Sequence, residues 1–144
     1  IEPHIQVANI IRQSGIETIP MGYILVDGDR QSAVERVSGC TPIAHQAVAD
    51  VVSHAVAGQL LGKQLIYIEA GSGAKTPVSI DIIRAVRQAI DLPLIVGGGV
   101  TLEEQMLAAF SAGANIVVIG NHFEQHPEDL PRFLQTKHSY VRNN

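Results

Sequence analysis

The sequence predicts an α/β fold in which helices cover a parallel sheet. Two short runs, residues 94–96 and 116–119, are entirely apolar and stop abruptly at Gly97 and Gly120. Strands buried on both faces read as such continuous apolar runs, which is typical of parallel sheets between helices. Stretches with helical spacing lie between the apolar runs, and this alternation indicates βαβ units. The 144 residues suffice for one domain with a sizeable core.

The first half of the chain predicts two helices and at least one strand. Residues 2–14 have amphipathic spacing that ends at Gly15, and residues 16–26 are expected to form one long strand with an irregularity at Pro20 and Gly22. A turn at residues 27–30 leads to residues 31–37, which we expect to be a second strand, with an irregular excursion as the alternative. A loop then precedes a long helix over residues 43–61.

The second half predicts three more strands and three helices. Residues 65–69, the run from Leu94 and residues 116–119 are the strands. Ser79 is suited to cap the helix that follows the first of them, and a T-x-x-E capping box at residues 101–104 predicts the start of the next. Residues 122–144 are expected to hold one short helix and a frayed tail.

The two glycine turns favour a particular kind of α/β fold. Glycine directly after a strand lets backbone amides approach a ligand closely, and the loops after strands 7 and 8 form the standard phosphate site of a (β/α)8 TIM barrel. Because a full barrel needs about 250 residues, we expect residues 1–144 to be the C-terminal four or so βα units of one barrel domain. The N-terminal strands would then lie outside this chain.

Composition excludes several classes of protein. The chain is 46% hydrophobic and 17% charged, as globular proteins are, and its net charge of −4 argues against nucleic-acid binding. No apolar run approaches the roughly 20 residues of a membrane span, and no signal peptide is evident. Cys40 is the only cysteine, so no internal disulfide forms. We therefore expect a cytoplasmic protein that is not transmembrane.

Three strings of residues resemble one known family. Y-I-E-A-G-S-G-A at residues 67–74, P-L-I-V-G-G-G-V at residues 93–100 and Gly120-Asn121 occur in that order, after I-P-M-G-Y at residues 19–23. Together they resemble the C-terminal part of the geranylgeranylglyceryl phosphate synthases, which are TIM-barrel prenyltransferases of ether-lipid synthesis. The resemblance implies transfer of a geranylgeranyl or similar prenyl group from its diphosphate to the C3 hydroxyl of sn-glycerol 1-phosphate, with Mg²⁺.

The same resemblance implies which residues bind the substrates. Tyr23 would lie nearer the prenyl side, and no metal ligand is expected in this chain, since the family binds Mg²⁺ through an Asp near its N-terminus. The residues expected around sn-glycerol 1-phosphate are Tyr67, Glu69, Gly71, Ser72, Gly73, Gly98, Gly99, Gly120 and Asn121.

Glu69 is the candidate catalytic base. Alternation along a strand directs Tyr67 and Glu69 to one face and Ile66 and Ile68 to the other, and an acid at the end of a barrel strand lies at the catalytic mouth. A substrate hydroxyl becomes a better nucleophile as it gives its proton to a positioned carboxylate. The alternatives are that Glu69 only accepts hydrogen bonds from loop amides and that Tyr67 is only an interior aromatic residue.

Two departures from the family pattern keep other functions open. Members usually carry Thr where this chain has Met21, and they carry an Asp-Lys pair where it has Gln46 and Ala47. A phosphate-binding fragment without catalysis, or another phosphate-binding barrel such as an FMN oxidoreductase, are the alternatives. His122 either touches the ligand or packs locally. Four βα units would leave sheet edges open, so we expect a homo-oligomer or pairing with an N-terminal half.

Overall fold

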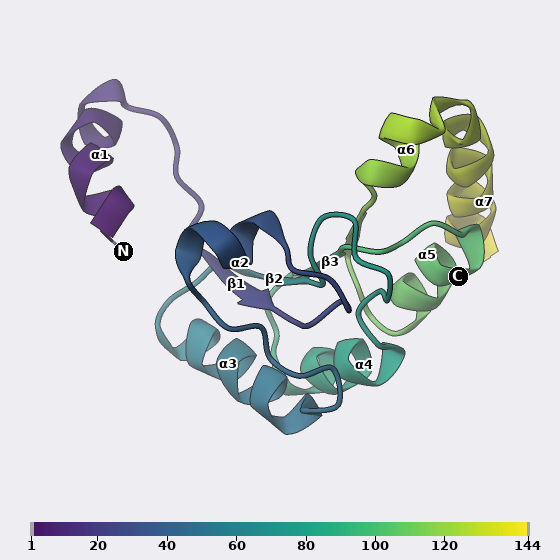
Figure 1. Cartoon of the computed structure of the whole chain (residues 1–144), viewed down its shortest axis with the longest axis horizontal. Coiled ribbons are helices and arrows are strands. Elements are labelled where there is room, and N and C mark those ends of the chain that lie inside the picture. Colours follow the sequence, from purple (N-terminus) through teal and green to yellow (C-terminus); the bar gives the residue numbers. More distant parts are fainter. Residues whose placement is uncertain (1, 144) are drawn as a thin grey trace.

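Four parallel strands form a single sheet in the computed structural model, which describes residues 2–143 (Figure 1). The strands lie in the order of the chain, and each pairs in parallel with the next. They are β1 (Met21–Leu25), β2 (Leu65–Glu69), β3 (Leu94–Gly97) and β4 (Ile116–Val118). This confirms the expected α/β class and its four parallel strands.

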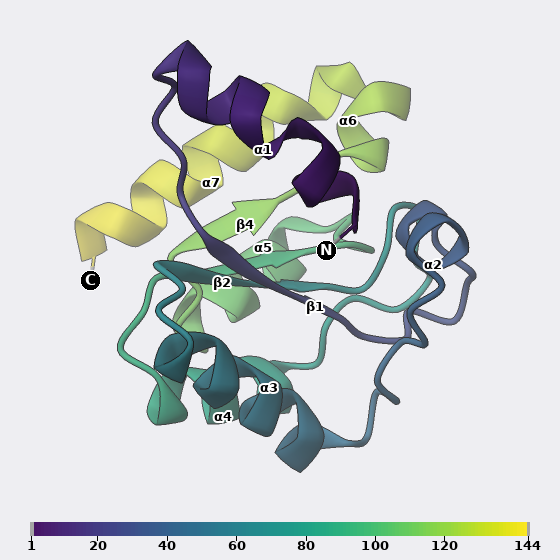
Figure 2. The same cartoon turned by 90° about the vertical axis from the view of Figure 1, so that its left-hand side faces the viewer.

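Helices cover one face of the sheet only. The helices α3 (Val48–Leu60), α4 (Ile80–Ala89) and α5 (Glu103–Ser111) follow β1, β2 and β3 and pack beneath them (Figures 1 and 2). Ile66 and Ile68 of β2 are fully buried against this layer, in the main hydrophobic core. The opposite face bears Tyr67 and Glu69, as strand alternation predicts, and none of the helices within residues 2–143 covers it.

The ends of the chain lie at opposite edges of the sheet. The helix α1 (Glu2–Ser14) stands apart beside β1, and its side chains from His4 onward are exposed (Figure 1). The helix α6 (Asn121–Gln125), a 3₁₀ turn (Pro127–Asp129) and α7 (Leu130–Asn143) follow β4. A second core cluster around Phe133 joins α7 to α5 and α6. None of the described helices has the length and apolar character that a membrane crossing requires.

Two expectations for the segment before α3 are wrong. Only Met21–Leu25 forms a strand within residues 16–26, because Pro20 lacks the N–H that would extend the ladder. Residues 31–37 are not a strand but contain most of α2 (Ala33–Ser38). A capping box begins this helix: the Ser32 hydroxyl accepts from the Glu35 N–H at 3.0 Å, and the Glu35 carboxylate accepts from the Ser32 N–H at 3.3 Å.

Three helix boundaries also differ from expectation. The helix expected from residue 43 begins at Val48, because Ile43 pairs in parallel with Val26 and so extends the edge of β1. The side chain of Gln105, and not a T-x-x-E box, caps the start of α5 by accepting from two backbone N–H groups. The tail expected to fray is the 14-residue helix α7, which Phe133 anchors; Asn144 lies outside the described residues.

Candidate functional site

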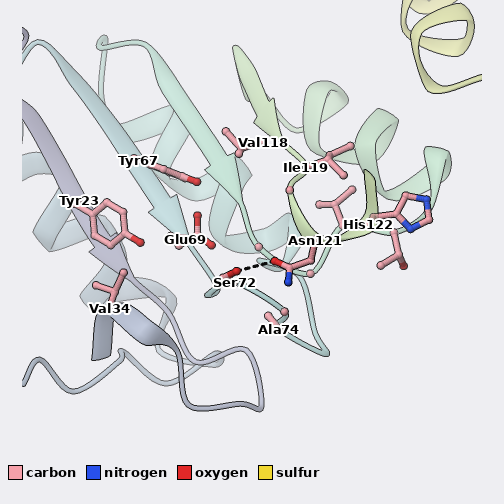
Figure 3. Close-up of a pocket in the computed structure, with 16 residues that line it drawn as sticks. Tyr23, Val34, Tyr67, Glu69, Ser72, Ala74, Val118, Ile119, Asn121 and His122 are labelled. Carbon is pink, nitrogen blue, oxygen red and sulfur yellow. Dashed lines mark hydrogen bonds between the residues drawn. The ribbon is translucent and has the colours of Figure 1, made fainter. Parts of the chain in front are cut away.

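A pocket of about 300 Å³ opens at the carboxyl ends of the strands, on the face that no helix covers (Figure 3). Residues of β1, β2, β4, α2 and α6 line it together with the loops that follow β2, β3 and β4. Its lining residues are Tyr23, Val34, Tyr67, Glu69, Ser72, Gly73, Ala74, Gly98, Gly99, Val100, Thr101, Val118, Ile119, Gly120, Asn121 and His122.

The structure brings nearly all sequence-predicted site residues together in this pocket. Tyr23 and eight of the nine residues expected around a glycerol phosphate line it. The exception is Gly71, which is buried directly behind Glu69. Met21, Gln46 and Ala47, where the sequence departs from the family pattern, are not among the lining residues.

Glu69 is held firmly although it is a charged residue. Its side chain is buried, with 8% of the residue exposed, and one carboxylate oxygen accepts from the Gly71 N–H at 3.0 Å. A hydrogen bond also joins the carboxylate to Tyr67. The geometry therefore fits both interpretations of Glu69. Its carboxylate accepts a hydrogen bond from a loop amide, and it also faces the pocket, where a substrate would bind (Figure 3).

The two tyrosines of the pocket remain neutral at physiological pH. Their rings meet edge to face, with centroids 5.2 Å apart. Burial, and then the charge of Glu69, raises the pKa of Tyr23 to about 12. Burial and the hydrogen bond to Glu69 raise the pKa of Tyr67 further. Both phenols can therefore donate hydrogen bonds to a ligand or to the carboxylate.

The opposite wall of the pocket is backbone. Gly98 has φ +87°, and a Cβ there would lie 2.8 Å from a carboxylate oxygen of Glu69 and 2.9 Å from the Ala70 nitrogen. Gly120 has neither a positive φ nor a neighbour within 4 Å of a Cβ. Within the described part of the chain, the N–H groups of Gly99 and Gly120 donate to no other residue. These groups are available to an anion.

Hydrogen bonds between loops fix the shape of the pocket. The Ser72 hydroxyl donates to the Asn121 side-chain oxygen at 2.6 Å, which joins the loop after β2 to the start of α6 (Figure 3). On the other side, the Gly28 carbonyl accepts from the Lys75 N–H at 2.9 Å, and Asp29 accepts from the Thr76 hydroxyl. The loop at residues 70–76 is therefore clamped between its neighbours.

His122 packs locally and also reaches the edge of the pocket. Its Nε2 lies 2.9 Å from a carboxylate oxygen of Asp129, and its ring contacts those of Phe123 and Phe133. No group of three or more histidine, cysteine, aspartate or glutamate residues suited to hold a metal ion occurs among residues 2–143.

Sequence reasoning does not assign six of the lining residues to the site: Val34, Ala74, Val100, Thr101, Val118 and Ile119. The strand expected over residues 31–37 conceals Val34, although the S-x-x-E spacing of Ser32 and Glu35 indicates a helix. Thr101 is expected to be a helix cap, and Val118 lies in a run that is expected to be buried on both faces. Val118 points into the pocket because the face of the sheet that carries it has no covering layer.

Comparisons with known proteins agree on one family. The family model described as PcrB matches residues 3–137. A protein of Spirosoma linguale named geranylgeranylglyceryl phosphate synthase is 44% identical over 132 residues, which are 92% of this chain and 53% of that protein. The chain thus spans about half the length of the curated relatives it matches.

Two solved structures are also similar. One is (S)-3-O-geranylgeranylglyceryl phosphate synthase from Thermoplasma acidophilum in complex with substrate sn-glycerol-1-phosphate, with a TM-score of 0.77 and 36% identity over 82% of this chain and 47% of that one. The other is wild-type GGGPS from Thermoplasma volcanium, with a TM-score of 0.85 and 33% identity over 98% of this chain and 55% of that one. The chain belongs to the PcrB family.

Proposed function

We propose that this chain carries the glycerol phosphate site and the catalytic base of a geranylgeranylglyceryl phosphate synthase. The observation that carries the proposal is the layout of one pocket, in which a buried carboxylate faces a wall of unpaired backbone N–H groups. The curated relatives bear the name of this enzyme, and one similar structure was solved with sn-glycerol 1-phosphate.

The backbone wall fits the phosphate of sn-glycerol 1-phosphate. N–H groups of Gly99 and Gly120 are available, and Ser72 and Asn121 supply side-chain polar groups next to them. Backbone amides bind phosphate oxygens without a basic residue, so a chain with net charge −4 can hold this ligand. The wall therefore fixes the orientation of the glycerol, whose C3 hydroxyl would extend toward β2.

Glu69 would act as the general base at the other end of the pocket. As the C3 oxygen bonds to the first carbon of the prenyl group, the bond from that carbon to the diphosphate breaks, and the hydroxyl proton passes to Glu69. The hydrogen bonds from Gly71 and Tyr67 hold the carboxylate in place for this transfer. Tyr67 is thus proposed to orient the base and to border the glycerol.

The prenyl diphosphate would approach from the side of Tyr23, where Val34 adds apolar surface. The described residues do not fit a Mg²⁺ site, because Glu69 is the only carboxylate among the lining residues and is already hydrogen-bonded. We therefore propose that the Mg²⁺ ligands of the family lie outside this chain.

We further propose that residues 1–144 form the C-terminal part of a TIM-barrel domain in a cytoplasmic protein. An open sheet of four parallel strands with helices on one face supports the barrel, as does the alignment with 55% of the Thermoplasma volcanium enzyme. The single cysteine supports a reducing compartment.

Replacing the base tests the proposed reaction. In the protein that carries this chain, Glu69→Gln should lower the rate of prenyl transfer to sn-glycerol 1-phosphate by about 100-fold or more, since the proton acceptor is lost. Binding of sn-glycerol 1-phosphate, measured by calorimetry, should persist. Glu104→Gln on the exposed side of α5 is the matched control and should leave both unchanged.

Two outcomes would count against this assignment. Full turnover in the Glu69→Gln variant would remove Glu69 from the chemistry. Binding without any turnover in the unsubstituted protein would favour the phosphate-binding alternative, to which the replacement of the Asp-Lys pair by Gln46 and Ala47 points.

A further inference from the structure

The pocket proposed for a phosphate has no basic side chain in its lining apart from His122, which lies against Asp129. It also contains the carboxylate of Glu69, whose negative charge opposes that of a phosphate. Backbone amides orient an anion, but they carry no net charge. A cation close to the phosphate end would therefore increase affinity considerably.

Arg30 places a guanidinium at this end of the pocket. It lies in the loop between β1 and α2, and its Nη1 is 3.4 Å from the carbonyl oxygen of Gly73, a lining residue. The loop that carries Arg30 is fixed because Gly28 accepts from the Lys75 N–H and Asp29 accepts from the Thr76 hydroxyl. The guanidinium is therefore held beside the pocket wall although the residue is exposed.

The missing side chain of Gly73 leaves a small space that two nitrogen donors share. A Cβ on Gly73 would lie 3.0 Å from Arg30 Nη1 and 3.7 Å from Asn121 Nδ2. Both nitrogens thus lie within 4 Å of one point at the pocket wall. An oxygen of an anion near that point could accept hydrogen bonds from both.

Both side chains keep N–H groups that a ligand can use. Within residues 2–143, Arg30 forms no ion pair, because the adjacent Asp29 accepts from Thr76 and from no arginine. The side-chain oxygen of Asn121 is occupied by the Ser72 hydroxyl, which leaves its Nδ2 hydrogens for a ligand. The guanidinium keeps most of its five N–H donors.

We propose that Arg30 is a substrate-binding residue, whose guanidinium and the side-chain amide of Asn121 together hold a phosphate oxygen beside Gly73. This rests on the proposed function and adds to it the charge that the pocket lining lacks. A phosphate monoester and a diphosphate share the chemistry that such donors recognise, and we assign the contact to the monoester of sn-glycerol 1-phosphate because Asn121 and Gly73 lie at that end.

Calorimetric titration with sn-glycerol 1-phosphate at two salt concentrations tests the assignment. Arg30→Gln should weaken binding roughly tenfold, because a charge-assisted hydrogen bond is lost, and should reduce its salt dependence. Arg30→Lys should bind sn-glycerol 1-phosphate with an affinity between those of Arg30→Gln and the unsubstituted protein, since lysine keeps the charge but not the planar donor set. Arg84→Gln, which removes an exposed arginine paired with Asp81 on α4, is the matched control and should bind as the unsubstituted protein does.

The possible results separate the two proposals. Equal binding by Arg30→Gln and the unsubstituted protein would overturn the role of Arg30 and leave the proposed function intact. A titration with inorganic diphosphate tests the other ligand that carries phosphate groups. If Arg30→Gln weakened the binding of diphosphate but not that of sn-glycerol 1-phosphate, the assignment to the monoester would be overturned. If the unsubstituted protein does not bind sn-glycerol 1-phosphate, both proposals fail.

Discussion

The glycines around the pocket are there for two different physical reasons. Gly98 has a positive φ, and its missing Cβ makes room for Glu69 and for the backbone at Ala70. Gly120 has an ordinary negative φ and open space where a Cβ would be. Packing therefore explains the first glycine, whereas close approach of a ligand is the remaining reason for the second.

This difference predicts opposite results for two alanine variants. Gly98→Ala should lower the free energy of unfolding by about 1–3 kcal/mol, because alanine is strained at this φ and its Cβ would press on backbone atoms. Gly120→Ala should leave stability within about 0.5 kcal/mol, as surface changes usually do, but weaken binding of sn-glycerol 1-phosphate. Urea unfolding and calorimetry measure the two effects. Equal loss of stability in both variants would contradict the distinction.

Tyr23 should make the protein sensitive to alkaline pH. Its pKa is raised to about 12, so between pH 10 and 12 the folded chain retains a proton that the unfolded chain has lost. Stability should therefore fall as the pH rises through this interval. In Tyr23→Phe the decline should be shallower, although Tyr67 still contributes, since its pKa is also raised. Thermal unfolding across this pH interval checks the slope, and identical slopes would refute the role of Tyr23.

At the scale of single elements, α2 depends on one residue. Ser32 is buried, its hydroxyl caps the helix, and its Cβ lies against Gly71 at the base of the pocket. Ser32→Ala should cost about 1 kcal/mol of stability, which is typical for loss of an N-cap. The matched control is Ser53→Ala in α3, where the hydroxyl bonds only the Ala49 carbonyl and alanine favours the helix.

Urea unfolding compares the two serine variants. We expect a lower midpoint for Ser32→Ala and an unchanged or slightly higher one for Ser53→Ala. A midpoint for Ser32→Ala equal to that of the control would mean that packing against Gly71, and not the cap, maintains α2.

The strands could be predicted from the sequence because apolar runs mark them, even in β4, where Ile116 and Val118 are exposed. Val96 lies in a continuous apolar run, and Ile68 lies in a run whose apolar residues alternate with Tyr67 and Glu69. Both patterns are typical of a β-strand. Elements that depend on one side-chain hydrogen bond are harder to predict from the sequence. The apolar residues near Val34 suggested a strand, whereas the bond between Ser32 and Glu35 decides for a helix.

The sequence likewise predicts some parts of the site and not others. The residues of the pocket could be named from the Y-I-E-A-G-S-G-A string and the two glycine turns, because the carboxyl ends of parallel strands meet at one edge of the sheet. The contact of Arg30 with the Gly73 carbonyl could not be predicted from the sequence. It joins residues 43 apart, and their approach depends on the conformation of two loops.

At the scale of the whole molecule, the sheet is open. Within residues 2–143, β1 does not pair with β4, and the face without helices presents apolar and aromatic residues in register across all four strands. This row consists of Tyr23, Tyr67, Ile95 and Ile116. Exposed apolar faces and open strand edges favour association with another chain.

We therefore expect this chain, prepared by itself, to self-associate through the open face. Ile116→Lys places a charge on that face at a residue that is 50% exposed, so the monomer should tolerate it while an apolar contact should not. Leu60→Lys is the matched control, because Leu60 is 81% exposed at the end of α3 beneath the sheet. Sedimentation velocity over a range of concentrations should show assemblies for the unsubstituted chain and for Leu60→Lys, and a shift toward monomer for Ile116→Lys. A stable monomer of the unsubstituted chain at every concentration would show that the open face does not drive association, and loss of assembly in Leu60→Lys would place the contact on the helical layer instead.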